Sequence, residues 1–203
     1  MQNRIIFISI LFIGFVCKAK DIPSSAYDNE IQLYRQQAMS TLSTQQGPLS
    51  PDTAKGLQYF VPNEAFKVIA SYQKIKADSI TVIPTYSGKQ NDYIEYAKLS
   101  FNLGGQDQEL TAFKGIKSMQ MPQYKNKIFI MFKDETNGIT TYGGGRYIYI
   151  EESLVEDNTL AIDFNKAFNP NCAYSDGYNC PIPPPENHLN VEINAGEKSF
   201  SKI

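Results

Sequence analysis

The hydrophobic positions near the N-terminus follow a helical period. Apolar residues fall on one side of a helix drawn over this region, at Ile31, Tyr34, Ala38 and Leu42. A repeat of three to four residues is typical of an amphipathic helix. Residues suited to cap such a helix stand before and after it, at Ser24, Ser25, Asp28 and Gly47-Pro48. The pattern predicts one helix over residues 26–43, which we expect to pack against a sheet.

The period changes to that of β-strands after residue 65. Runs of β-branched and aromatic residues are separated there by Gly, Asn, Asp and Pro, as in short strands joined by turns. The runs cover residues 66–75, 79–86, 93–103, 109–116, 127–132, 146–151 and 160–164, and a further short run covers 189–193. Gly104-Gly105 and Asn137-Gly138 suit tight turns, because Gly and Asn accept positive φ angles. Runs this close in sequence predict antiparallel pairing.

These elements predict a single β-rich domain over residues 20–203. The class is mainly β (α+β), with one N-terminal amphipathic helix (26–43) and a strand meander (57–163). A long irregular Pro-rich C-terminal loop with a final strand (164–203) completes it. Seven or eight consecutive strands must pair their edges or close. We therefore expect an antiparallel curved sheet or a barrel-like meander.

The first 19 residues resemble a secretory signal peptide. Arg4 precedes the apolar run Ile5–Val16, and Ala19 is the small residue expected at a cleavage site. The run is shorter than the about 20 residues of a membrane span. We expect a secreted or periplasmic protein with no integral membrane span after processing. A lipoprotein anchored at Cys17 and a retained anchor helix are the alternatives, and bulky residues before Cys17 disfavour the first.

The net charge of the chain limits the classes of molecule that it is expected to bind. Cleavage removes two of the 19 basic side chains, which leaves 17 against 21 acidic ones. A mildly acidic and unclustered balance argues against nucleic acid or an anionic membrane surface, since both favour dense Lys and Arg. The chain is long enough to bury a core without disulfides.

Two segments hold most of the unusual residues, and their motifs resemble a known family. The first reads D-x-T-x-G-x-x-T-Y-G-x-G-R-Y over residues 134–147. The second reads D-F-N-x-A-x-N-P-x-C-A-Y from Asp163, then C-P-x-P-P-x-E-N from Cys180, then A-G-E at 195–197. This combination resembles the bacterial domain of unknown function 1684 family from about Ile31 to the C-terminus. The resemblance implies that both segments belong to one architecture, and it implies no established activity.

The triple glycine at 143–145 is not the phosphate loop of a nucleotide-binding protein. The glycines precede a strand-like run instead of a helix, and no Lys-Ser or Lys-Thr pair follows them. We interpret them as a tight turn or bulge where no Cβ fits. Arg146 follows directly, and its guanidinium can bind a carboxylate of the protein or of a ligand. An internal salt bridge to Asp163 or Glu197 is the expected use.

Cys172 and Cys180 are expected to form a disulfide, because they are close in sequence and the compartment is oxidising. A zinc site with His188 is the alternative, and the absence of paired C-x2-C spacing disfavours it. We therefore expect no metal and no cofactor. The prolines at 181 and 183–185 predict an extended strap of polyproline II over an open end of the barrel.

The function expected from these features is that of an exported binding or interaction module. The 133–147 turn and the cysteine-bearing loop would together present a ligand site, whose candidate residues are Tyr142, Arg146, Asp163, Tyr174 and Glu186. The partner would be an unknown small molecule or an envelope protein. One alternative is a hydrolase that uses carboxylates or a cysteine of the C-terminal loop. Another is a structural envelope protein.

Overall fold

A computed structural model describes residues 25–76 and 80–201. The expected signal segment (1–19), its cleavage site and Cys17 lie outside the described residues. Helix α1 (Ala26–Leu42) confirms the predicted helix to within one residue. Ser25 caps it, because the Ser25 hydroxyl accepts from the backbone N–H of Asp28 and the Asp28 carboxylate accepts from the N–H of Ser25. Within the described ranges, no helix is long and apolar enough to cross a membrane.

Seven antiparallel strands form one sheet in the described part of the chain. They are β1 (Lys67–Lys74), β2 (Ile80–Pro84), β3 (Gln90–Leu103), β4 (Gln106–Gly115), β5 (Lys127–Phe132), β6 (Arg146–Glu151) and β7 (Thr159–Asp163). The order is β6-β5-β4-β3-β1-β7, and β2 also pairs with β3. The protein is therefore mainly β, and all seven predicted strands before the C-terminal loop are present.

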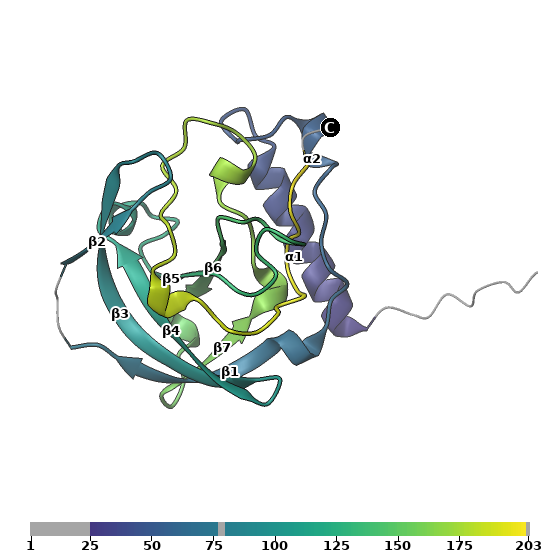
Figure 1. Ribbon diagram of the computed structural model, residues 1–203. Helices are drawn as coiled ribbons and strands as arrows, with labels where there is room; N and C mark the ends of the chain where they lie inside the picture. Colours follow the sequence, from purple (N-terminus) through teal and green to yellow (C-terminus); the bar gives the residue numbers. More distant parts are fainter. Residues whose placement is uncertain (1–24, 77–79, 202–203) are drawn as a thin grey trace, which may run out of the picture.

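The sheet curves until it nearly closes into a barrel (Figure 1). Strand β3 is long enough to pair with β2 at its start and with β1 further along, and a register shift between Glu95 and Ala97 interrupts its pairing with β4. Such irregularities bend a strand. The chain is not a simple meander, because β7 returns to pair with β1 at the edge opposite β6. Tyr147 of β6 and Phe168 after β7 exchange two backbone hydrogen bonds of 2.9 and 3.0 Å across the remaining gap.

Short helical turns connect these elements. The predicted turn-rich connection at 49–59 contains the four-residue helix α2 (Pro51–Ala54), which Ser50 caps. The 3-10 turns are η1 (Glu64–Phe66), η2 (Ser118–Gln120), η3 (Glu152–Leu154), η4 (Phe164–Lys166), η5 (Asn171–Ala173) and η6 (Pro185–Asn187).

The predicted final strand at 189–193 does not form. Leu189 and Ile193 are buried while Asn190 and Glu192 are exposed, so the alternating pattern correctly reports which side chains face inward. The segment nevertheless crosses the open end of the barrel (Figure 1), and its pairing in the described residues is limited to an isolated parallel bridge between Lys133 and His188. The N–H of Leu189 donates to the Lys133 carbonyl at 2.8 Å, and the N–H of Glu135 donates to the Val191 carbonyl at 3.1 Å. Alternation indicates burial, and a strand also needs a continuous ladder with a partner.

The proline-rich segment packs against the sheet as a strap, in agreement with the sequence. The N–H of Ile182 donates to the Pro84 carbonyl at 2.9 Å, which fixes the strap to β2. Asn187, fully buried, fixes it to β4 and β5. Its side-chain amide donates to the carbonyls of Thr111 and Met131 at 2.8 and 2.7 Å, and its oxygen accepts from the N–H of Thr111.

The triple-glycine turn lies under this strap. Gly145 has φ +89°, and a Cβ built on it would lie 2.6 Å from the Phe132 carbonyl oxygen and 2.7 Å from Pro183 Cγ. This contact confirms a turn in which no side chain fits.

We predict that Gly145→Ala lowers the free energy of unfolding by about 3 kcal/mol, because it adds backbone strain and a steric clash. Gly138→Ala is the matched control, since Gly138 has φ +79° but nothing within 4 Å of an added Cβ. The control should lose about 1 kcal/mol. Urea denaturation of both variants measures the difference, and equal losses would contradict the packing of the strap on Gly145.

Candidate ligand-binding site

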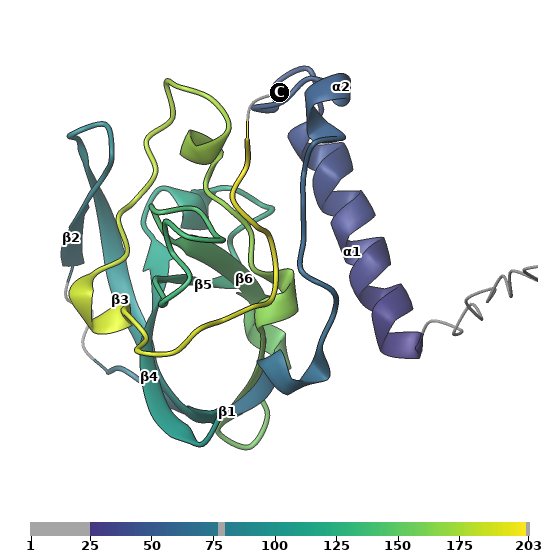
Figure 2. The ribbon, with the colours of Figure 1, turned by 45° about the vertical axis from the view of Figure 1, so that its right-hand side comes forward.

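An open cavity of about 670 Å³ lies between α1 and the adjoining end of the barrel. Figure 2 shows α1 standing beside the barrel, with the chain that follows α2 running down between them. The lining residues are Tyr34, Gln37, Ala38, Thr41, Leu42, Thr44, Gln46, Gly47, Pro48, Tyr59, Gln123, Tyr124, Lys127, Tyr149, Ala167, Phe168, Asn171 and Glu197. The volume lies within the about 300 to 1,000 Å³ of small-molecule sites.

Aromatic rings form much of the wall. Tyr149 of β6 stacks on Phe168 with ring centroids 5.9 Å apart, and it lies 5.0 Å from the ring of Tyr124. On the helix side, the Tyr34 hydroxyl donates to the Lys166 carbonyl at 3.0 Å, which orients its ring. Burial raises the pKa of Tyr34 to about 12, so its hydroxyl remains protonated at neutral pH. The wall therefore offers ring faces with polar groups at their edges.

Glu197 supplies a buried carboxyl group to this cavity. Its side chain accepts from the Tyr174 hydroxyl, which lies 2.6 and 2.7 Å from the two carboxyl oxygens. Asn169 donates to it twice, from its backbone N–H at 3.1 Å and its side-chain amide at 2.8 Å. Burial nevertheless raises the pKa of Glu197 to about 7, although these donors and the charge of Arg146 lower it. A carboxyl group that titrates near neutral pH inside a cavity is typical of functional sites.

The Ala195-Gly196-Glu197 motif explains how this carboxyl is positioned. Gly196 has φ +76°, and a Cβ there would lie 2.7 Å from the carbonyl oxygens of both Phe164 and Ala167. Glycine thus lets the C-terminal segment approach the chain that follows β7. The N–H of Glu197 then donates to the Ala167 carbonyl at 2.9 Å, which directs the side chain toward Tyr174 and Asn169.

Arg146 holds the same segment from inside the barrel and is completely buried. Its guanidinium pairs with Asp134 at 2.7 Å, so the salt bridge exists but its partner is neither Asp163 nor Glu197. It also donates to the carbonyls of Ala195 and Ile193, the latter at 2.9 Å. Burial lowers the pKa of Arg146, and the adjacent Asp134 carboxylate counteracts this change. The role of Arg146 in this structure is to orient the backbone before Glu197.

A second polar group lies where α1 meets the start of the barrel. Asp163 accepts from the Tyr27 hydroxyl of α1 at 3.0 Å and caps η4 through the N–H of Asn165. Arg35, which is 7% exposed, places its guanidinium 4.7 Å from the centre of the Tyr59 ring. Its Nε and Nη2 atoms have no hydrogen-bond partner within the described part of the chain. Burial lowers the pKa of Arg35, and the charge of Asp163 opposes this shift.

The five residues that the sequence indicated as one site have different surroundings. Tyr174 contacts the cavity through Glu197, and Arg146 reaches it through the backbone of the same segment. Asp163 lies at the α1 contact. Tyr142, half-buried, packs against the triple-glycine turn, and Glu186 is exposed on the strap.

None of these five side chains is among the described residues that line the cavity. The sequence indicated Glu197 only as a possible partner of Arg146 and did not place it among the candidate site residues.

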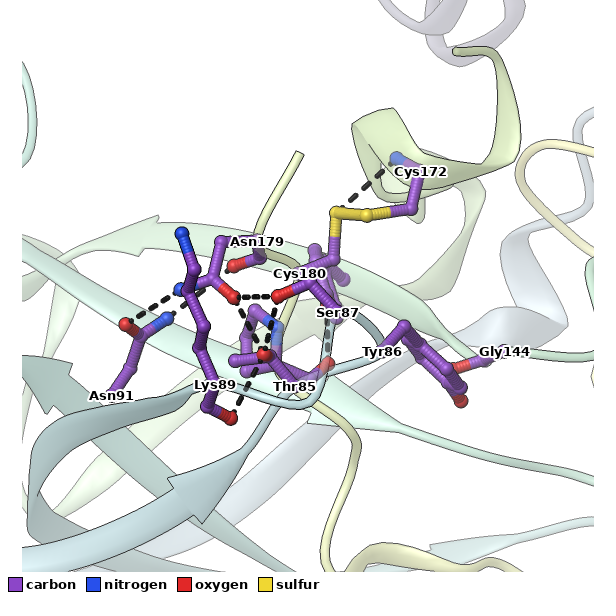
Figure 3. The surroundings of a disulfide bond; sticks show 11 residues. Thr85, Tyr86, Ser87, Lys89, Asn91, Gly144, Cys172, Asn179 and Cys180 are labelled. Carbon is purple, nitrogen blue, oxygen red and sulfur yellow. Dashed lines mark hydrogen bonds between the residues drawn. A yellow bond between two sulfur atoms is a disulfide. The ribbon is translucent and has the colours of Figure 1, made fainter. Parts of the chain in front are cut away.

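Cys172 and Cys180 lie at disulfide distance, with their sulfur atoms 2.20 Å apart, as the sequence predicted (Figure 3). Beside them, the Asn179 side chain bonds to Thr85 at 2.5 Å and to Asn91 at 3.1 Å. The loop that carries Tyr174 is thereby tied to the turn between β2 and β3. Within residues 25–76 and 80–201, no three or more side chains of His, Cys, Asp and Glu lie together in a group that could hold a metal ion.

We predict that the stability of the protein depends on pH through Glu197. Its pKa rises from 4.5 to about 7 on folding, so the folded state binds more protons than the unfolded state between these values. The free energy of unfolding should fall by about 3 kcal/mol as the pH rises from 4.5 through 7. Glu197→Gln should remove this decrease in urea denaturation between pH 5 and 8. A variant with the same pH dependence as the wild type would contradict the assignment.

The fold and part of the sequence are shared with other proteins. A family model described as "Protein of unknown function (DUF1684)" matches residues 52–198. The solution NMR structure of an uncharacterized protein of Haloarcula marismortui is similar, with 30% sequence identity and a TM-score of 0.64. The similarity covers 85% of this chain and 94% of that one. Among curated proteins, the comparison finds no match. Because the family model spans more than half of the chain, the protein belongs to the DUF1684 family, whose function is unknown.

Proposed function

We propose that this protein binds a small organic molecule in the cavity between α1 and the barrel. One observation supports this above all: an open cavity of about 670 Å³ is lined in part by Glu197, a residue that is 1% exposed and carries a carboxyl group. Aromatic walls with a few convergent polar groups are the usual composition of such a site.

The energetics of Glu197 support a role beyond the fold. Burying a carboxyl group is costly, and a buried amide could make several of the same hydrogen bonds without that cost. Only hydrogen bonds from uncharged donors, Tyr174 and Asn169, compensate it directly. A carboxyl group whose burial lowers the stability of the fold is more easily explained by a role in ligand binding than by a role in stabilising the protein.

The cavity can be tested by filling it. Ala38 of α1 lines the cavity, whereas Gln36 is exposed on the same helix outside it. We predict that Ala38→Phe weakens binding of the neutral dye Nile red about tenfold, because the added ring occupies the space. Gln36→Phe adds the same ring on the exposed side and should leave the affinity unchanged. Fluorescence titration measures both, and equal affinity in the two variants would refute the cavity as the site.

The alternative proposal is a hydrolase with Glu197 as its acid or base. A carboxyl group with a pKa of about 7 can both accept and donate a proton at neutral pH. Glycosidases, however, use two carboxyl groups, and Glu197 is the single one among the described residues that line the cavity. This is why we place binding first. The cysteine version of the hydrolase is less favourable, because Cys172 and Cys180 are paired.

We also propose that the protein acts after export, as a secreted or periplasmic protein, with a small molecule or an envelope protein as its partner. The support is the composition of residues 1–19 together with the Cys172–Cys180 pair. Intact-mass measurement of protein from its native cells should show the loss of residues 1–19. Reduction should then add about 2 Da, from one disulfide. A product that retains residue 1 with free thiols would refute export.

A further inference from the structure

The groups around the cavity favour one class of ligand, and we propose that it binds a small organic cation, such as an amine or quaternary ammonium compound, with its charge beside Glu197. This inference rests on the binding function proposed above and adds the charge and chemical class of the ligand.

Among the described residues the Glu197 carboxylate forms no salt bridge, although the charge of Arg146 favours its ionised form. Its oxygens accept from Tyr174 and Asn169, which are uncharged donors. The nearby Arg146 is already paired with Asp134 at 2.7 Å. The basic group of the cavity wall, Lys127, is paired with a different carboxylate, that of Glu151, at 3.5 Å. A cation bound beside Glu197 would therefore supply the ion pair that this carboxylate does not form among the described residues.

The aromatic walls suit the same ligand. Tyr34 and Tyr59 line the same cavity as Glu197, and burial raises the pKa of both hydroxyl groups, with a further contribution from the charge of Glu197. The faces of such rings attract cations, and quaternary ammonium groups are commonly held in this way. The protein itself gives an example, because the Arg35 guanidinium lies 4.7 Å from the centre of the Tyr59 ring. A ligand cation would thus be attracted both by the charge of the Glu197 carboxylate and by the faces of the tyrosine rings.

Ligand binding should be coupled to the protonation of Glu197. The ionisable groups that act on it are Tyr34 of α1, Tyr59, Tyr174 and Arg146 of β6. The three tyrosines stay neutral near pH 7 because burial raises their pKa values, and Arg146 is the one group of the four that carries a charge. Burial is the dominant influence that holds the carboxyl group in its neutral form. A bound cation offsets that influence, and the ionised form then prevails.

The test compares choline with its uncharged isostere 3,3-dimethylbutan-1-ol, by NMR titration of the wild-type protein. At pH 8 choline should bind about tenfold more tightly, since the two probes differ in charge and hardly in shape. From pH 8 to pH 6 the affinity for choline should fall about tenfold, because the ionised fraction of a group with a pKa of about 7 falls to about one-tenth. The affinity for the alcohol should not change.

Glu197→Gln should abolish both the preference for choline and its pH dependence. Glu186→Gln, which removes an exposed carboxylate outside the cavity, should preserve both. The wild-type pH series gives the answer even if the Glu197 variant does not fold. Equal binding of the two probes would overturn the cation inference and leave the binding function intact. Binding of neither would also overturn it, and the dye titration with the Ala38 variant would decide the binding function separately.

Discussion

The fully buried salt bridge between Arg146 and Asp134 anchors the C-terminal segment inside the barrel. The Arg146 guanidinium pairs with Asp134 and donates hydrogen bonds to the carbonyls of Ile193 and Ala195. These hydrogen bonds add to a discontinuous ladder, because in the described residues the C-terminal segment pairs with other segments through isolated bridges, Tyr59 with Glu197 and Lys133 with His188. Removing one partner of a buried ion pair typically costs about 3 to 5 kcal/mol, because the other charge is left without compensation.

The candidate site depends on the same constraint. Arg146 and the close approach at Gly196 fix the backbone on either side of Ala195, and this places the Glu197 carboxyl beside Tyr174 and Asn169. The paired cysteines fix the loop that carries Tyr174. Helix α1 then closes the cavity from outside, and it precedes the part of the chain that the family model matches. The end of the barrel forms the inner wall of the cavity and α1 forms the outer wall, and Glu197 lies on the inner side.

The local elements could be predicted from the amino-acid pattern alone. Helical spacing predicted α1 to within one residue, and runs of β-branched and aromatic residues predicted all seven strands. These features are local, since the period of a side-chain pattern and the positive φ of Gly104 and Gly105 require no distant partner. The pairing of Cys172 with Cys180 is also a local feature, because the two residues are separated by only eight positions.

The contacts between distant residues, in contrast, became known from the folded structure. Asp134 became the partner of Arg146, the 189–193 run became an irregular plug, and Glu197 entered a cavity that none of the five expected site residues lines. Each of these outcomes depends on which segment crosses the open end of the barrel and how deeply its side chains are buried there. The spacing of residues along the chain does not predict how deeply a segment is buried. Desolvation, which sets the pKa of Glu197, likewise arises only when distant segments pack around the group.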